Sequence, residues 1–360
     1  MSSQHTDRIQ TSLTELLGIR HPVLLAGMNV AAGPKLAAAV TNAGGLGVIG
    51  GINYTPDMLR DQISELKSSL LDKKAPFGVD LLIPQIGGSA RKTNKDYTKG
   101  KLNELVDIII ESGAKLFVSA VGVPPKAVVE RLHRAGILYM NMVGHPKHVQ
   151  KCLDLDVDII CAQGGEGGGH TGDIPTTVLV PAVVNIVRDK QSSFTRQAVQ
   201  VVAAGGIHDG RLLAAALMMG ASAVWVGTRF ILTDEAAAPT SHKEAVRGAG
   251  FDDNIRTTIF TGRPMRVLKT PYVVSWEEER RTELKELLSQ GVVPAEADLD
   301  RLMEDESSNE EEILDQVYPK MMGQCAAVVS EQKPAADVVQ DLVDTAVIAL
   351  TQNFEMAPKL

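Results

Sequence analysis

Short aliphatic runs recur at a steady interval along roughly the first 230 residues, and this rhythm constrains the fold more than any other feature of the chain. Eight runs predict strands, because each is rich in aliphatic side chains and most are bounded by Gly, Pro, Asn or Asp. The predicted strands cover residues 22–26, 46–50, 77–83, 115–121, 137–143, 157–163, 200–204 and 223–229.

The segments between these runs carry apolar residues at intervals of three and four, a spacing typical of helices. Helices are expected over residues 34–42, 57–71, 102–112 and 126–135. Parallel strands need crossover helices, so eight alternations predict an α/β fold, the (β/α)₈ TIM barrel. An open doubly wound sheet is the alternative, but eight parallel strands are many for it and no G-x-G-x-x-G follows the first strand.

The rhythm breaks after the eighth predicted strand. We expect residues 13–232 and a final helix at 335–352 to form the barrel, with 233–334 as a helical insertion or subdomain. The acidic run at 304–312 is interpreted as a solvated helix face or loop. The polar stretch 89–101 follows the third strand and is either a lid over the catalytic end or a surface loop.

Composition excludes several classes of partner. The net charge is −8 and no long basic run exists, so nucleic acid is not expected to bind. No apolar stretch reaches the roughly 18 residues of a membrane span.

Three cysteines without metal-type spacing indicate reduced thiols in a cytoplasmic protein. The C-terminal Pro358-Lys359-Leu360 is close to the Ser-Lys-Leu address, so a peroxisomal location is the alternative.

A glycine-rich loop follows the sixth predicted strand, with the sequence QGGEGGGHTG at 163–172. In a barrel of this kind the active site lies at the carboxyl ends of the strands. Such a loop lets backbone amides approach a flat or anionic ligand, and it brings His170 to the barrel mouth as a candidate general base. The alternatives are a histidine that only bonds the loop, or a phosphate loop without catalysis. Glu166 either orients His170 or caps a helix, and we favour the structural role.

Two further loops are candidates for a phosphate site. Gly205 and Gly206 follow the seventh strand, and Gly227 and Thr228 follow the eighth. Barrels often bind a phosphate with the loops after these two strands. The phosphate would belong either to a substrate or to FMN. No histidine pair has metal-ligand spacing with carboxylates or thiols beside it, so no metal is expected.

Two other strands contribute candidates for ligand contact. Gly27, Met28 and Asn29 follow the first strand, where a thioether and an amide would suit the side of an isoalloxazine ring. Read alone, Met28 is more typical of ordinary packing than of a ligand contact. Asp80 lies within the third strand, where a buried acid needs a partner, so we expect it to face the barrel mouth.

Five stretches together resemble the nitronate monooxygenases, formerly called 2-nitropropane dioxygenases, and GGEGGGHTG resembles a fungal-like subgroup. The stretches are 22–47, AQGGEGGGHTG at 162–172, AAGGI at 203–207, WVGTRF at 225–230 and TGRPMR at 261–266. The resemblance implies an FMN-binding barrel that oxidises alkyl nitronates with O₂ to carbonyl compounds and nitrite. Neutral nitroalkanes are a second substrate class that it implies.

The resemblance also implies residue roles. His170 would remove the α-proton of a nitroalkane or position the nitronate. The other implied contacts are Gly27, Met28 and Asn29 at the flavin, Gln163, Gly168 and Gly169 at the ring and ribityl chain, and Gly206, Trp225, Val226, Gly227 and Thr228 at the phosphate. The chain departs from the family pattern at Gly27, Gly167 and Asp80, where the family often has Pro, Ala and Asn.

Two rival functions fit the same residues. One is an FMN-dependent NAD(P)H oxidoreductase that reduces enoyl thioesters or quinones, because those enzymes also carry a glycine-rich loop with histidine. The other is a phosphate-binding barrel without flavin. All three readings take small molecules as partners, and both a monomer and a homodimer are compatible with the sequence.

Overall fold

The computed structural model of the protein describes residues 9–303 and 317–352, and its centre is a barrel of parallel strands. The strands hydrogen-bond in the order β1-β9-β8-β6-β5-β4-β3-β2. A parallel bridge between Leu24 and Leu46 joins β1 to the chain just before β2 and closes the ring. The strands are β1 Val23–Leu25, β2 Gly47–Gly51, β3 Phe77–Leu82, β4 Leu116–Ala120, β5 Leu138–Val143, β6 Ile159–Gln163, β8 Gln200–Ala204 and β9 Ala223–Val226.

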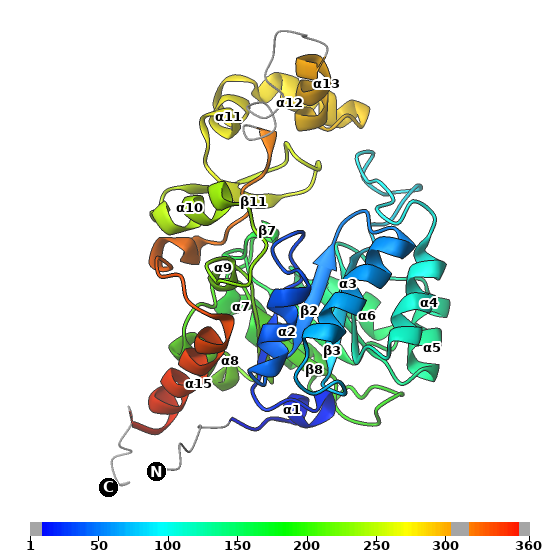
Figure 1. Ribbon diagram of the computed structural model, residues 1–360. Helices are drawn as coiled ribbons and strands as arrows, with labels where there is room; N and C mark the ends of the chain where they lie inside the picture. The colour runs from blue at the N-terminus through cyan, green and yellow to red at the C-terminus, as the bar shows by residue number, and fades with distance from the viewer. Residues whose placement is uncertain (1–8, 304–316, 353–360) are drawn as a thin grey trace, which may run out of the picture.

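Helices surround the barrel and return the chain from each strand to the next (Figure 1). Several begin at a defined cap, as where the Thr55 hydroxyl accepts from Met58 N–H before a proline in the first turn. The final helix packs against α8 and α2. The helices are α1 Ser12–Leu17, α2 Pro34–Asn42, α3 Pro56–Ser69, α4 Leu102–Ser112, α5 Lys126–Arg134, α6 Val149–Leu153, α7 Thr176–Val187, α8 Gly210–Met218 and α15 Ala335–Gln352.

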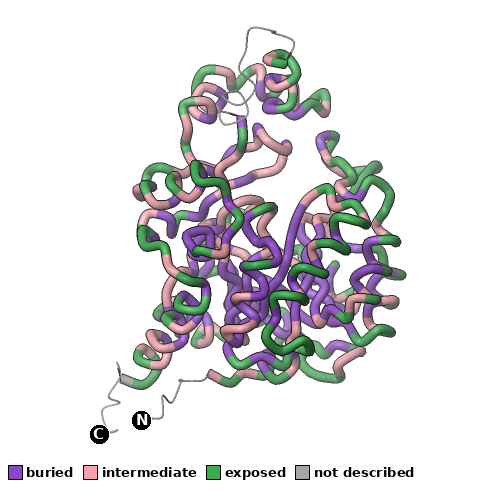
Figure 2. The backbone as a smooth tube through the Cα atoms, viewed as in Figure 1, coloured by how far each residue is buried: buried purple, intermediate pink, exposed green. Residues whose placement is uncertain are grey.

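Two apolar layers hold the barrel together. Alternate strand residues such as Leu24, Val48 and Val118 fill its interior, and Leu13 and Leu17 of α1 join this inner cluster. The intervening residues face outward and pack under the helices, in a larger cluster that includes Val79 and Val224. Both faces of each strand are therefore buried, as the tube view shows (Figure 2), which explains why the strands read as continuous aliphatic runs.

The predicted barrel is confirmed, with one error at its last strand. All eight predicted strands are present, and α2, α4 and α15 have the predicted bounds. The prediction for the eighth strand runs too far, because β9 ends at Val226 and Thr228 begins the short helix α9 (Thr228–Ile231). The acidic run at 304–312 and the C-terminal tripeptide lie outside the described residues.

The segment after the barrel contains strands as well as the expected helices. Its elements are α10 Thr240–Gly248, β10 Asn254–Thr257, β11 Met265–Leu268, α11 Pro271–Val274, a π-helical turn Ser275–Glu279, α12 Arg281–Gln290 and α13 Pro294–Met303. β10 and β11 form an antiparallel sheet with β7 (Gly169–His170), which belongs to the glycine-rich loop. The sequence reading missed this sheet, because its strands are short and β7 has no strand-like composition.

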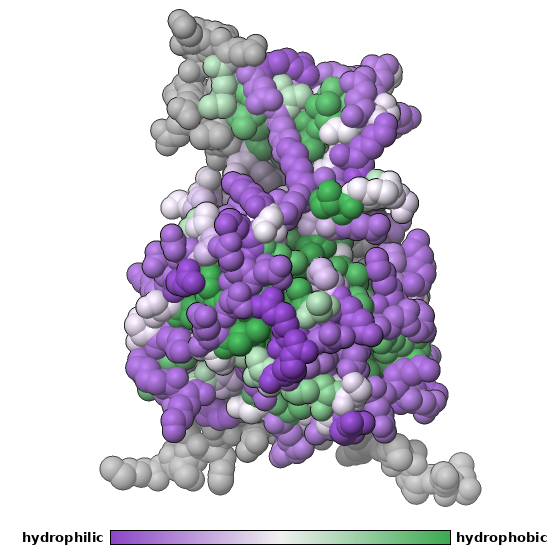
Figure 3. Space-filling view, turned by 90° about the vertical axis from the view of Figure 1, so that its right-hand side faces the viewer, coloured by the Kyte–Doolittle hydropathy of each residue, from purple (hydrophilic) through white to green (hydrophobic). Residues whose placement is uncertain are grey.

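Helices α11, α12 and α13 form an upper lobe, and a waist separates it from the barrel in the space-filling view (Figures 1 and 3). The lobe has its own apolar cluster around the fully buried Trp276. The Asp298 carboxylate accepts hydrogen bonds from Trp276 Nε1 at 2.9 Å and from both terminal nitrogens of Arg280 at 2.8 and 2.9 Å. The buried carboxylate is thus satisfied on several sides, as a buried charge requires.

The polar stretch after β3 contacts this upper lobe. Lys95 forms an ion pair with Glu296, and Lys92 Nζ donates to the Ser289 carbonyl at 2.7 Å. The stretch therefore lies between the barrel mouth and the insertion. Within the described part of the chain, no helix is long and apolar enough to cross a membrane.

Candidate active site

A cavity of about 1000 Å³ lies at the carboxyl ends of the barrel strands and is bounded on the other side by the insertion. Residues of the barrel and of the segment after it line the cavity, and the latter include Phe260 and Leu299. The predicted site residues that line it are Gly27, Met28, Asn29, Asp80, Gln163, Gly168, Gly169, His170, Gly205, Gly206, Trp225, Gly227 and Thr228.

Val226 is the one predicted site residue that does not line the cavity. Its side chain is fully buried in the outer apolar cluster. Only its backbone therefore remains available to a ligand at this corner of the barrel.

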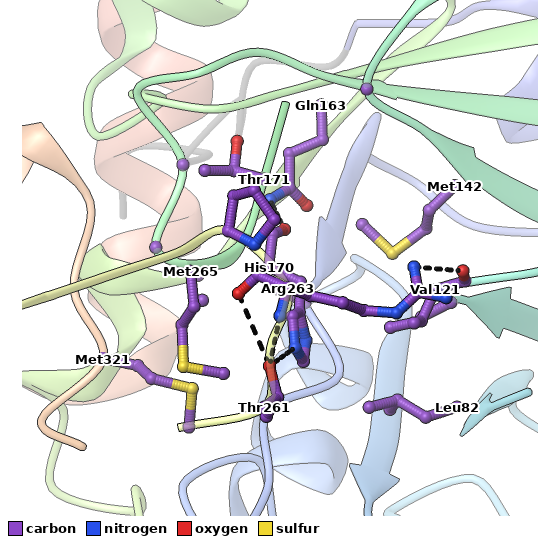
Figure 4. A pocket seen from close by; sticks show the side chains of 18 of the residues that line it. Leu82, Val121, Met142, Gln163, His170, Thr171, Thr261, Arg263, Met265 and Met321 are labelled. Carbon is purple, nitrogen blue, oxygen red and sulfur yellow. Dashed lines mark hydrogen bonds between the residues drawn. The ribbon is translucent and has the colours of Figure 1, made fainter. Parts of the chain in front are cut away.

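His170 is held in the cavity by the insertion as much as by its own loop. Its strand β7 pairs with β11, with His170 opposite Met265. The Gln163 amide donates to the His170 carbonyl at 2.8 Å, and His170 Nε2 lies 2.9 Å from Thr261 Oγ1 (Figure 4). Burial, with the nearby Arg263 guanidinium, lowers the pKa of His170 to about 4. The imidazole is therefore neutral at neutral pH and able to accept a proton.

Arg263 is a site residue that sequence reasoning did not single out. Its side chain extends into the cavity, where Nε donates to Asn94 Oδ1 at 3.0 Å and Nη1 donates to the Val121 carbonyl at 3.2 Å (Figure 4). Burial and the positive charge of Arg91 lower the pKa of Arg263. The residue lies within the TGRPMR stretch of the resemblance, which was the signal available in the sequence.

The charged residues that line the cavity are predominantly basic. Three acids line the cavity. Asp173 pairs with Arg256 and Glu296 pairs with Lys95, while Asp80 is uncharged because burial raises its pKa. The remaining basic residues form no ion pair with any described residue, and they are Arg91, Arg263, Lys147 and Lys151. The cavity is therefore suited to an anionic ligand.

Asp80, within β3, lines the cavity. It is 2% exposed, and its Oδ1 atom is buried without a hydrogen-bond partner among the described residues. Burial raises the pKa of Asp80 to about 8, so the carboxyl group is protonated at neutral pH. An ionised acid beside an anionic ligand is thus avoided.

Gly27 is required by the position of Asp80. A Cβ atom at Gly27 would lie 2.4 Å from Asp80 Oδ2. Two of the three departures from the family pattern, Gly27 and Asp80, are therefore in contact. A side chain at position 27 would force Asp80 to move.

The glycine-rich loop serves protein packing more than its sequence indicated. A Cβ atom at Gly168 would lie 2.8 Å from the backbone nitrogen of Gly323, and one at Gly164 would lie 2.1 Å from Thr176 Oγ1. The Glu166 carboxylate accepts from Thr176 N–H and hydroxyl at the start of α7, which confirms its structural role. Only part of the glycine content therefore gives a ligand access to the backbone.

The corner formed by the loops after β8 and β9 has the features of a phosphate site. Gly205 and Gly206 have φ angles of +100° and +76°, which suit glycine and turn the backbone toward the cavity. The Thr228 hydroxyl accepts from Gly323 N–H at 2.9 Å. The C-terminal segment therefore contributes to this corner.

Metal ligands are not gathered anywhere in the described residues. No group of three or more His, Cys, Asp or Glu side chains there has the arrangement of a metal site. The three cysteines are buried free thiols.

A parallel barrel with a glycine-walled, basic cavity at the carboxyl ends of its strands is the architecture of enzymes that act on small molecules. Comparison with known families makes the class specific. The family described as nitronate monooxygenase matches residues 10–345, and the chain belongs to this family of oxidoreductases.

Relatives of known description act on different substrates. The chain is 38% identical over 274 residues to the 5-hydroxy-7a-methyl-1-oxo-octahydro-1H-indene-4-carboxyl-CoA dehydrogenase of Mycobacterium tuberculosis, covering 76% of this chain and 70% of the relative. FabK from Thermotoga maritima superposes with a TM-score of 0.73 at 30% identity, over 95% of this chain and 97% of FabK. Nitroalkane oxidase from Streptomyces ansochromogenes gives 0.74 at 27% identity, over 94% and 99% of the two chains.

Proposed function

We propose that the protein is an FMN-dependent enzyme that oxidises alkyl nitronates, and neutral nitroalkanes, with O₂ to carbonyl compounds and nitrite. The observation that carries the proposal is that a neutral His170 and the Arg263 guanidinium line the same cavity. Arg263 forms no ion pair with any described residue. A nitronate is an anion that already holds the electron pair to be given up. A guanidinium beside a neutral base suits such an ion and its conjugate acid.

The residues of the cavity fit FMN. The φ angles at Gly205 and Gly206 and the start of α9 at Thr228 suit a phosphate, and the unpartnered Asp80 Oδ1 is a buried polar atom that a ligand would satisfy. When bound, FMN would supply the acceptor for the electron pair and the route to O₂. Gln163 and Met28 line the same cavity and would contact the cofactor.

His170 and Arg263 would divide the work on the substrate. The imidazole, kept neutral, would take the α-proton of a neutral nitroalkane at Nε2 or Nδ1. The guanidinium would orient the nitro oxygens and offset the negative charge that develops as the proton leaves. The resulting imidazolium would lie near Arg263, so the anion between the two cations is needed to stabilise the protonated base.

We also propose the division of the chain into a barrel, residues 13–232 with 335–352, and an insertion, 233–334. The insertion supplies Thr261 and Arg263 to the cavity and covers its mouth. In this division the barrel would hold the cofactor, and the insertion would complete the substrate site.

Anaerobic mixing of the purified protein with ethylnitronate, NADH and NADPH in separate experiments tests the function. We expect loss of flavin absorbance with ethylnitronate, and nitrite after air is admitted. Bleaching by a nicotinamide and not by ethylnitronate would contradict nitronate oxidation. A colourless purified protein that does not bind added FMN would contradict flavin chemistry altogether.

Replacing Arg263 with glutamine should weaken the binding of nitronate. We expect KM for ethylnitronate to rise about tenfold, because a hydrogen bond to a charged group contributes roughly 1.5–3 kcal/mol and other basic residues remain nearby. Loss of the positive neighbour should also raise the pKa of His170 toward its ordinary value. Steady-state kinetics against pH would measure both effects.

The matched control for this substitution is Arg60→Gln. Arg60 is an exposed arginine of α3 that does not line the active-site cavity. Unchanged KM in Arg263→Gln, or an equal rise in both variants, would show that Arg263 does not bind the substrate.

A second candidate function is an FMN-dependent oxidoreductase that acts on thioesters or uses NAD(P)H. The specific observation in its favour is the neutral acid at Asp80, a departure from the nitronate family that gives the cavity a potential proton donor. The similarity to a carboxyl-CoA dehydrogenase supports the same candidate. The anaerobic comparison described above distinguishes this candidate from nitronate oxidation, because bleaching by NADH or NADPH and not by ethylnitronate is expected only for the NAD(P)H-dependent enzyme.

A further inference from the structure

Four basic side chains gather where the chain leaves β5, at one side of the cavity. We call His145, Lys147, His148 and Lys151 the basic rim. All four line the cavity and are exposed to solvent. His145 caps a 3₁₀ turn, Pro146–His148, which carries Lys147 and His148, and Lys151 lies on α6, which follows the turn directly.

The arrangement places like charges together without compensation. Lys147 and Lys151 are four residues apart in a continuous helical segment, a spacing that puts like charges on one face and destabilises a helix. Neither lysine forms an ion pair with a described residue. The nearest acid in sequence, Asp154, accepts a hydrogen bond from Gln150 at 2.8 Å and does not line the cavity.

One histidine of the rim, His145, presents a hydrogen-bond donor, and the other, His148, has a lowered pKa beside the lysines. His145 Nδ1 accepts from the backbone N–H of Lys147 at 3.1 Å. With Nδ1 occupied as an acceptor, the ring proton lies on Nε2, which is free to donate. Partial burial and the charges of Lys147, His145 and Lys151 lower the pKa of His148, which places the four groups within one local field.

The basic rim is separate from the corner proposed for the FMN phosphate. β5 is followed around the barrel by β6, and only then by β8 and β9, whose loops form that corner. The glycine-rich loop with His170 extends from the end of β6, between the two. A ligand held at the rim would therefore approach His170 from the side opposite the cofactor phosphate.

The cavity has to hold FMN as well as the substrate. Its volume of about 1000 Å³ lies at the upper end of the range for drug-sized ligands. Met142, on β5 just before the rim, points into this space near Arg263 (Figure 4). Met142 thus offers an apolar contact inside the cavity next to the positively charged rim.

We propose that the basic rim binds the phosphate groups of a nucleotide-bearing substrate or cosubstrate, with its reacting end beside His170. Coenzyme A thioesters and nicotinamide dinucleotides both present phosphates at one end and a reactive group at the other. Lysine and histidine donors at a cavity mouth recognise such phosphates by charge and hydrogen bonding. This site goes beyond nitronate oxidation and depends on the proposed function only for the position of FMN.

The test uses the FMN-loaded protein and calorimetric titration with coenzyme A, 3′-dephospho-coenzyme A, NADPH and NADH. We expect the double variant Lys147→Gln/Lys151→Gln to raise Kd about tenfold or more for the nucleotide that binds, since charge-assisted contacts are lost. Tighter binding of coenzyme A identifies a thioester site, and tighter binding of a nicotinamide identifies a hydride donor site.

The matched control is Lys35→Gln/Lys126→Gln, which removes two exposed lysines from the first turns of α2 and α5 at the same end of the barrel. Neither lysine lines the cavity. Equal effects of the two double variants, or no nucleotide binding to the FMN-loaded wild type at millimolar concentration, would overturn the proposal. Loss of FMN from the rim variant would overturn it as well, because the rim would then hold the cofactor. Nitronate turnover measured in parallel reports separately on the proposed function.

Discussion

Replacement of His170 with asparagine should lower kcat/KM for nitroethane by about 100-fold or more, in the range of a general base contribution. Asparagine keeps a polar side chain near Thr261 but cannot take the α-proton. Ethylnitronate, supplied already deprotonated, should lose much less activity than nitroethane. FMN content should be unchanged, because the loop backbone and the Gln163 contact to position 170 are retained.

The pH dependence gives a second measurement of the same role. With the pKa of His170 lowered to about 4, the base form persists through the range where an ordinary histidine titrates. We therefore expect kcat/KM for nitroethane to show no acid limb near pH 6.5 in the wild type. His133→Asn, a substitution on α5 away from the cavity, is the control. Normal turnover of nitroethane by His170→Asn would exclude His170 as the base.

Replacement of Asp80 with asparagine should stabilise the flavin-free protein by several kcal/mol at pH 8 and by little at pH 4. Burial raises the pKa of Asp80 in the fold to about 8, from the ordinary value of 3.8. The unfolded chain ionises between these two values while the fold keeps the proton, so stability falls as pH rises through this window. One pKa unit corresponds to about 1.4 kcal/mol, which sets an upper bound of several kcal/mol for this fully buried group.

Denaturant unfolding of wild type and variant at pH 4, 6 and 8 would measure this difference. Asp61→Asn, which changes an exposed acid of α3, is the control and should leave the difference close to zero at every pH. A gain that is the same at pH 4 and pH 8 would mean that Asp80 is ionised in the fold. Asparagine is also the residue that the family often has here, so the variant should retain flavin.

The residues around His170 in this cavity come from two parts of the chain that the sequence keeps far apart. His170 and Thr261 are 91 residues apart in the sequence, yet His170 Nε2 lies 2.9 Å from Thr261 Oγ1. Sequence reading found His170 because glycines around it make a recognisable loop. It did not single out Arg263, although this residue lies in the TGRPMR stretch of the resemblance, because the sequence does not show which groups surround an arginine after folding.

The sequence by itself determined the barrel. Eight buried strands leave continuous aliphatic runs, and the helix patterns between them favour a parallel closed arrangement. The eight barrel strands and the helices α2, α4 and α15 could therefore be predicted within a few residues. It also determined the glycine-rich loop and the residues that follow each strand, because the fold places those residues at one end.

Only the tertiary structure decided the chemistry of the site. The pairing of β7 with β11 depends on backbone hydrogen bonds between segments with weak strand propensity, so no local pattern predicts it. The neutral state of Asp80 and the lowered pKa of His170 arise from burial and from charges brought close by folding, which composition does not contain. The loop around His170 is thus set by sequence, while its charge and its partners are set by the insertion folded over it.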